Sequence, residues 1–251
     1  MDLSLYADFF SFLEGKNVKY TVDGNIVCLN DYNYSLFLVL ESASNSVVSF
    51  NAEREAQKAL NGKFLIFIWF DLWHIKKNVI LSKITHLLGK SKKIHARKTS
   101  VEIVSKEECE FFFNENHLNQ PVLGYKRIGL YLDSNLIGLA SFAKRRKFRD
   151  DTYSSELLQF ATVNGTHING GLTKIIKYFR KLHSFDSLMT YIDLDWSSGE
   201  KFFTTGFVFD SYKSPVFFET EIDENFRSLS NLETNIFNLG SIKSVRYFEK
   251  L

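Results

Sequence analysis

A pair of glycines between an apolar strand and an amphipathic helix most constrains the fold of this chain. Residues 156–162, Glu-Leu-Leu-Gln-Phe-Ala-Thr, have the composition of a strand, and Gly170-Gly171 stands directly before Leu-Thr-Lys-Ile-Ile-Lys-Tyr-Phe, where apolar residues recur at helical spacing. The first N–H groups of a helix lack partners and lie at the positive end of its dipole. Such a glycine pair either cradles an anion such as phosphate or only permits a tight strand-to-helix turn.

A second strand and a short helix are predicted after this first helix. The strand ends at Tyr191-Ile-Asp193, and the short helix lies between Ser198-Gly199 and Gly206-Phe207. Ligand-facing residues of α/β sheets tend to stand at strand ends, which makes Asp193 a candidate site residue. Glu156 begins the strand that faces the same region. The alternatives are a helix cap for Asp193 and a solvated strand-end charge for Glu156.

Composition excludes several classes of protein. The chain has 251 residues, 45% of them hydrophobic and 24% charged, which are ordinary globular values. Two cysteines, Cys28 and Cys109, exclude a disulfide framework and a cysteine-rich zinc site, and the histidines show no metal-ligand spacing, so no metal is expected. The acidic N-terminus lacks the basic region of a signal peptide, and the apolar run 64–70 is too short to span a bilayer. We expect a cytoplasmic protein without a membrane partner.

The pattern along the chain predicts an α/β (α+β) fold in two domains, 1–98 and 99–251. The first would hold helices over 3–13, 52–60 and 76–88 and strands over 18–22, 25–29, 34–40 and 64–70. A basic connector, residues 90–98, closes it. In the second domain, the capping-box spacing Ser105-x-x-Glu108 begins a helix, and a hairpin turning at 133–135 precedes the glycine pair.

The second half of the chain carries a series of short motifs, found at residues 114–118, 128–131, 136–142, 156–160, 170–174, 191–193, 196–199, 206–207 and 238–243. On these motifs it resembles the GNAT-like, Mom-like acyltransferase-type domain of phage homing-endonuclease-like proteins. The resemblance implies acetyl-CoA or a related thioester as cofactor, bound by Gly170, Gly171 and Thr173. It also implies proton transfer by Glu156 or Asp193. Phe202 stands where the family usually has a tyrosine that protonates the departing thiolate, with Tyr191 and Tyr178 as replacements.

His117 is a further candidate catalytic residue. It follows an aromatic helix face within the first of these motifs, residues 114–118. A lone histidine is more often a hydrogen-bonded structural residue than a base, so the structural alternative stays open.

The first half resembles the nuclease half of the same proteins, which is similar to very-short-patch-repair endonucleases of the PD-(D/E)XK class. The matching segments are residues 64–73, 80–84, 87–90 and 93–98. Nucleases of this class hold a divalent metal with acidic residues on adjacent strands. The resemblance puts those acids near Asn25 and near Phe37, and neither position is acidic. The nuclease centre is therefore predicted to be lost.

Two basic runs, 90–98 and 144–149, favour contact with a phosphate backbone, the second with Phe148 interleaved. Charge runs are also common in solvated loops, which is the alternative. With a net charge of only +2, the case for nucleic acid depends on these local patches. The candidate residues, with double-stranded DNA as the expected partner, are Lys92, Lys93, Arg97, Lys144, Arg145, Arg146 and Arg149.

The leading hypothesis from the sequence is a phage or mobile-element nucleic-acid-binding protein, a pseudo-nuclease derived from a homing-endonuclease-like ancestor. The first alternative is a GNAT-type N-acyltransferase, including one that modifies nucleic acid. The second alternative is a non-catalytic protein that binds a protein partner. Whether the chain is an enzyme is left open, with acyl transfer favoured over nuclease activity.

Overall fold

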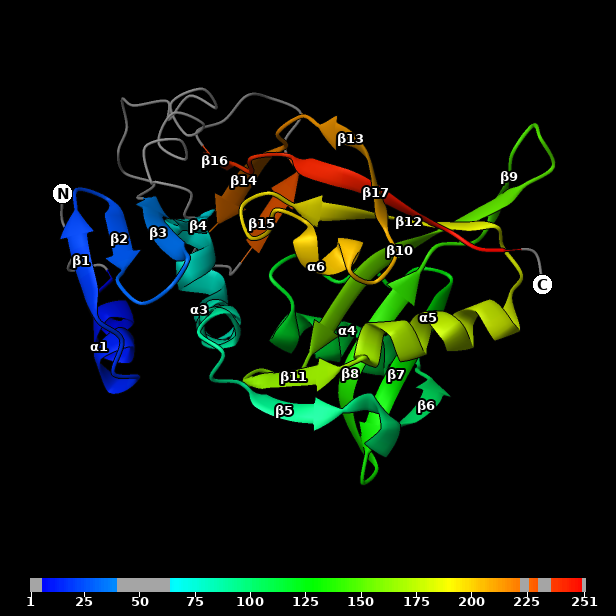
Figure 1. Ribbon diagram of the computed structural model, residues 1–251, viewed down its shortest axis with the longest axis horizontal. Helices are drawn as coiled ribbons and strands as arrows, with labels where there is room; N and C mark the ends of the chain where they lie inside the picture. The colour runs from blue at the N-terminus through cyan, green and yellow to red at the C-terminus, as the bar shows by residue number, and fades with distance from the viewer. Residues whose placement is uncertain (1–5, 40–63, 222–225, 230–235, 250–251) are drawn as a thin grey trace. The chain divides into compact units, whose positions relative to one another are not determined.

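The computed structural model describes residues 6–39, 64–221, 226–229 and 236–249 of the chain (Figure 1). The described chain divides into two compact units. Unit 1 comprises Met1–Leu81, Asp193–Ser198 and Ser214–Gly240, and unit 2 comprises Ser82–Ile192, Gly199–Lys213 and Ser241–Leu251. These units are defined by contacts, whereas the predicted domains follow the order of elements and the basic connector, so the domain boundary predicted after residue 98 stays a prediction.

Unit 2 contains an eight-stranded sheet in a mixed α/β arrangement. Its spatial order is β13 (Val208–Lys213), β17 (Ser241–Tyr247), β12 (Ser187–Asp193), β10 (Tyr153–Thr162), β8 (Asn135–Phe142), β7 (Lys126–Leu132) and β6 (Ser100–Ile103), with β9 (Arg146–Lys147) paired to β10. Strands β10 and β12 pair in parallel, whereas β6–β7, β7–β8, β8–β10 and β13–β17 pair antiparallel. A parallel pair requires a crossover connection, which here contains a helix.

Two helices cover opposite faces of this sheet. Helix α5 (Gly171–Leu182) packs against a cluster that includes Ala140, and helix α4 (Lys106–Asn116) packs against one that includes Leu139. Successive side chains of a strand point to opposite faces, so these neighbours in β8 place the helices on the two sides. The predicted capping box is confirmed, because the Ser105 hydroxyl oxygen accepts the Glu108 N–H at 3.0 Å.

The order predicted around the glycine pair is confirmed, with one strand added. Strand β10 is followed by β11 (Thr166–Asn169), α5, β12 and the short helix α6 (Glu200–Phe203). Strand β11 pairs in parallel with β5 (Lys92–His95), which lies inside the predicted basic connector (Figure 1). The connector also holds a 3-10 turn, η2 (Ala96–Lys98). The strand went unrecognised because Ile94 is the one apolar residue in β5, which is too few for an alternation to show.

Unit 1 begins with α1 (Ala7–Gly15) and a four-stranded sheet. Strands β1 (Tyr20–Asp23), β2 (Ile26–Leu29) and β3 (Tyr34–Val39) pair antiparallel, and β3 pairs in parallel with β4 (Phe64–Trp69). The helix predicted over 52–60 lies outside the described residues. A small sheet of β14 (Phe217–Glu221), β15 (Phe226–Leu229) and β16 (Ile236–Phe237) completes the described part of this unit.

Helix α3 (Phe70–Leu87) starts earlier than the sequence pattern predicted. The prediction began at Lys76, and Lys76 has non-helical dihedral angles, φ −128° and ψ 33°, where two helical segments join. The aromatic residues before that kink pack locally, with Trp73 against Tyr6 and Phe9. No helix within the described ranges is long and apolar enough to cross a membrane.

Candidate functional site

Strands β10 and β12 of unit 2 pair only at their first halves. Their parallel register runs from Ser154 opposite Ser187 to Leu157 opposite Thr190, and both strands continue beyond it. At the last pair of this register, the Thr190 hydroxyl donates to the Leu157 carbonyl oxygen at 3.0 Å. The pairing of β10 with β8 also shifts register between Leu157 and Gln159. Beyond this point, the carboxyl-terminal half of β10 has no partner on its β12 side among the described strands.

The start of α5 offers unpaired N–H groups at the same edge of the sheet. A crossover helix runs antiparallel to the strands it joins, so its N-terminus lies near their carboxyl ends. Gly170 caps this helix in the left-handed conformation, with φ +77°. Within the described chain, no residue accepts the N–H groups of Gly171, Leu172 or Thr173, and the first helical bond runs from Lys174 to Gly170. This end of α5 can therefore bind an anion.

The two glycines have different structural roles. Gly170 is exposed and adopts a conformation that a side chain would strain. Gly171 is buried, and a Cβ there would lie 3.0 Å from Ile168 and 3.1 Å from Leu130. The tight-turn alternative is therefore observed, and because the turn also leaves N–H groups without acceptors, the anion-binding alternative stays a prediction. Lys174 ties this turn to the segment beside it by donating to the carbonyl oxygens of Ala96 and Thr99.

Glu156 lies on β10 just before the register shift and is half-buried. Burial raises the pKa of its carboxyl group, and the nearby Arg146 partly opposes that effect. A carboxyl group with a raised pKa is a stronger base when ionised, which suits acceptance of a proton from an attacking amine. The geometry is compatible with the predicted role of Glu156.

His117 lies in a network that shapes the loop after α4. Its Nδ1 accepts the Asn119 N–H at 3.1 Å and lies 3.2 Å from the Gln159 side-chain nitrogen. Gln159 in turn donates to the Gln120 carbonyl oxygen and accepts the Val122 N–H at 2.6 Å. One ring nitrogen of His117 thus serves the loop, which is the structural alternative for a lone histidine. Its catalytic role stays a prediction.

Asp193 belongs to unit 1 and shapes a turn there. Its Oδ1 accepts the Asp195 N–H at 3.0 Å, and its carbonyl oxygen accepts the N–H groups of Trp196 and Ser197. These bonds correspond to the capping alternative for this residue. Its role as a proton acceptor stays a prediction.

The residue that would protonate a leaving thiolate is not Phe202. Its ring packs edge-on against Phe207, with the centroids 5.7 Å apart, and it carries no ionisable group. Tyr178 lies on α5 and packs against the cluster under that helix. Tyr191 follows the last paired residue of β12 and is 43% exposed. Both tyrosines stay predicted replacements, and Tyr191 is the more exposed of the two.

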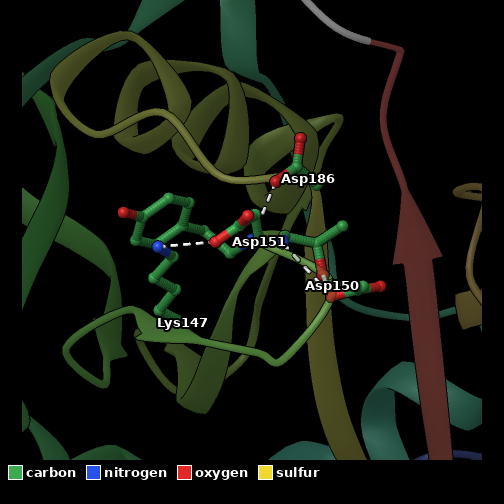
Figure 2. Close-up of polar contacts among 6 residues, drawn as sticks. Lys147, Asp150, Asp151 and Asp186 are labelled. Carbon is green, nitrogen blue, oxygen red and sulfur yellow. Dashed lines mark hydrogen bonds and ion pairs between the residues drawn. The ribbon is translucent and has the colours of Figure 1, made fainter.

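Much of the basic run 144–149 is engaged within unit 2. The Arg145 guanidinium lies 4.3 Å over the Tyr153 ring and donates to the Ser184 carbonyl oxygen at 2.7 Å. The Lys147 ammonium pairs with the Asp151 carboxylate at 2.6 Å, and Figure 2 shows the two side chains turned toward each other. Lys144 and Arg145 also line a pocket of about 350 Å³ together with Tyr125 and His183.

The acidic residues next to this run serve the turn into β10. The Asp150 carboxylate accepts from the Thr152 hydroxyl, and the Asp186 carboxylate accepts the Tyr153 N–H at 2.8 Å. Figure 2 labels the two aspartates. The first contact is local, whereas the second joins residues 33 positions apart and fixes the start of β10. The other predicted nucleic-acid contacts are exposed side chains. They are Arg146 on β9, Arg149 in the loop after it, Lys92 and Lys93 on β5, and Arg97 on η2.

The positions expected for nuclease acids do come together in unit 1. Ile26 pairs with Phe37 across β2 and β3, which puts the turn residue Asn25 next to the partner strand. Neither expected position carries a carboxylate. In the part of the chain that the structure describes, no group of three or more His, Cys, Asp or Glu side chains could hold a metal ion.

Comparison with known proteins finds likeness only at the level of structure. No family model and no curated protein matches the chain. Arabidopsis thaliana Naa50, solved in complex with a bisubstrate analogue containing CoA, is 10% identical over 60% of this chain and 99% of its own, with a TM-score of 0.44. A Bacillus subtilis acetyltransferase in complex with CoA is 13% identical over 61% and 100%, with a TM-score of 0.38.

A third neighbour is yncA from Salmonella typhimurium, a putative acetyltransferase solved with acetyl-CoA. It is 11% identical over 61% of this chain and 96% of its own, with a TM-score of 0.41. Likeness of this degree assigns neither a family nor an activity to this chain. Its described residues form a mixed α/β fold, and a nuclease-type first half, phage origin and DNA binding find no support in these comparisons.

Proposed function

We propose that unit 2 transfers an acyl group from a CoA thioester to an amine. The observation that carries this proposal is the separation of β10 from β12 beyond Leu157 and Thr190, at the edge where α5 begins. A thioester lying between the two strands would reach the unpaired N–H groups of α5 with its phosphates. This is the alternative from the sequence, and it is better supported than the nuclease-derived hypothesis.

The residues of unit 2 divide the chemistry between an acid and a base. Glu156, with its raised pKa, takes the proton from the attacking amine. The amine nitrogen bonds to the acyl carbon, and the bond from carbon to sulfur breaks. Tyr191 supplies a proton to the departing thiolate. Acetyl-CoA is the thioester that we propose, and the amine acceptor is left unspecified.

Calorimetric titration with CoA and acetyl-CoA tests this proposal, followed by an assay of thiol release with a panel of amines. Thr173→Asp is the informative variant. An acidic residue in the first turn favours the helix and repels a phosphate, so it should abolish binding without loss of stability. Thr173→Ser is the control. The proposal is wrong if neither CoA nor acetyl-CoA binds the unmodified chain.

A second candidate function is nucleic-acid binding, favoured by the pocket beside Lys144 and Arg145. Two exposed aromatic side chains accompany these cations. Tyr125, which is 46% exposed, lines the same pocket, and Phe148, which is 54% exposed, lies in the same basic run. Anisotropy of a short labelled duplex DNA should show binding that weakens steeply with salt. Binding that is absent at low salt, or insensitive to salt, would eliminate this candidate.

A further inference from the structure

A second pocket in unit 2 is lined by basic and polar groups from three segments. Its volume is about 270 Å³, and its lining residues are His86, Gly89, Ser91, Lys93, His167 and Asn169. The parallel register of β5 and β11 sets Lys93 beside His167, while Ile94 and Ile168 are buried. Because side chains alternate along a strand, Lys93 and His167 share the outer face.

Lys201 from α6 lies beside this pocket and adds a second ammonium group to that of Lys93. Its Nζ lies 2.8 Å from Nε2 of His86. An ammonium group only donates, so His86 accepts this bond as a neutral imidazole. The His86 and His167 rings stack with their centroids 4.5 Å apart. Cations and imidazoles therefore gather at one place.

The electrostatics of this group lack a balancing negative charge. Burial, Lys201, His167, Lys83 and Lys93 together lower the pKa of His86 to about 4. Burial, Lys201 and Lys93 also lower the pKa of His167, whereas its hydrogen bond with Asn169 opposes this. No carboxylate of the described residues contributes to either shift. Like charges are thus held close together, which is unfavourable unless an anion joins them.

We propose that this pocket binds the phosphate group of a small phosphorylated ligand. A phosphomonoester carries about −1.5 to −2 charges and three acceptor oxygens, which match the ammonium groups of Lys93 and Lys201. The Ser91 hydroxyl is buried without a hydrogen-bond partner and can donate to the same group. The positive charges that favour a phosphate would repel a metal cation.

The size and form of the pocket favour a small ligand over a nucleic-acid backbone. A volume of about 270 Å³ holds a phosphate and part of the group that bears it, whereas a backbone needs a strip of cations along a surface. The pocket is lined by the end of α3, β5 and β11, with α6 beside it, and these elements differ from the separated halves of β10 and β12. The proposal therefore does not depend on acyl transfer.

Phosphate binding should be linked to protonation of His86. The titratable groups that face this ring are Lys83 on α3, Lys93 on β5, His167 on β11 and Lys201 on α6. Negative charge beside them favours the imidazolium form, so the pKa of His86 should rise when phosphate binds. Lys201 would then release Nε2 and bond to the phosphate.

NMR of the histidine rings tests the proposal. The protein is titrated from about pH 5 to about pH 8, once with inorganic phosphate and once with chloride at equal ionic strength. Phosphate should shift the His86 and His167 signals saturably and raise the pKa of His86. Lys201→Met and Lys93→Met should each weaken phosphate binding about tenfold, as expected for one lost charge-assisted contact. Lys181→Met, on the exposed C-terminal turn of α5, is the control and should bind as the unmodified chain does.

Circular dichroism confirms that each variant is folded before its affinity is compared. The proposal is overturned if phosphate and chloride give the same histidine shifts. It is also overturned if folded Lys201→Met and Lys93→Met bind phosphate as well as the control does. A DNA strand without terminal phosphates that displaces inorganic phosphate from the pocket would contradict the small-ligand assignment.

Discussion

Trp69 on β4 donates its indole N–H to Oδ2 of Asp195 at 2.7 Å, across 126 positions of the sequence. The other carboxylate oxygen of Asp195 accepts the Leu239 N–H, also at 2.7 Å. The Asp195 carbonyl oxygen accepts the Phe67 N–H at 3.1 Å. Asp195 is only 2% exposed, so one buried residue joins three separate stretches of unit 1.

Asp195→Ala should lower the free energy of unfolding by about 3 kcal/mol, because it leaves two buried N–H donors without an acceptor. Chemical denaturation followed by tryptophan fluorescence measures this loss. The control is Asp8→Ala, whose side chain is 70% exposed in its ion pair with Lys77 and which should cost below about 1 kcal/mol. Equal losses in the two variants would contradict the structural role of Asp195.

Glu156→Gln should abolish acyl transfer without loss of stability at neutral pH. A carboxyl group whose pKa is raised by folding favours the protonated form in the folded state, so its ionisation destabilises the fold as pH rises. The neutral glutamine removes that cost, and it cannot accept the amine proton. Thermal unfolding and initial rates at several pH values test both parts.

In the unmodified chain, the acid limb of the rate profile should lie above the pKa of about 4.3 of a free glutamate. A limb at or below that value would show that another group is the base. A variant that keeps its full rate would exclude Glu156 from the chemistry altogether.

Tyr191→Phe should lower kcat by about two to four orders of magnitude while KM stays nearly constant, because general acid catalysis contributes on this scale and the ring is retained. The side chain is 43% exposed, so stability should change by less than about 0.5 kcal/mol. Tyr212→Phe on β13, 65% exposed, is the matched control. A rate that falls equally in both variants would contradict a specific role for Tyr191.

Local signals in the sequence predicted the local structure. Ser105 and Glu108 are three residues apart, so the spacing within one short segment is enough to predict their capping bond. The glycine pair before α5 works in the same way. Strand β5 escaped prediction because its pairing partner, β11, lies far along the chain and supplies the reason for its extended form.

The candidate site was only partly predictable for the same reason. Glu156 and the α5 glycines could be found, since each follows from a strand or helix pattern. His86 and Lys201, which contact across 115 positions, share no sequence signal. Asp195 likewise has partners on β4 and at Leu239 that no local pattern connects to it. Tertiary contacts decide such roles, and spacing along a single chain does not encode them.

Substitution of the α5 glycines should separate backbone strain from packing. Gly170→Ala should cost about 1 kcal/mol, since its φ of +77° disfavours a side chain but the Cβ would lie 3.8 Å from its nearest neighbour. Gly165→Ala, with φ +75° and nothing within 4 Å, is its matched control and should cost the same. Helix propensity alone predicts that Gly171→Ala raises the free energy of unfolding. We expect the variant to fall about 1–3 kcal/mol below that value, because its Cβ would lie 3.0 Å from Ile168 inside the core. Denaturant unfolding of the three variants measures these costs, and a Gly171→Ala variant as stable as the unmodified chain would show that the helix can shift away from β11.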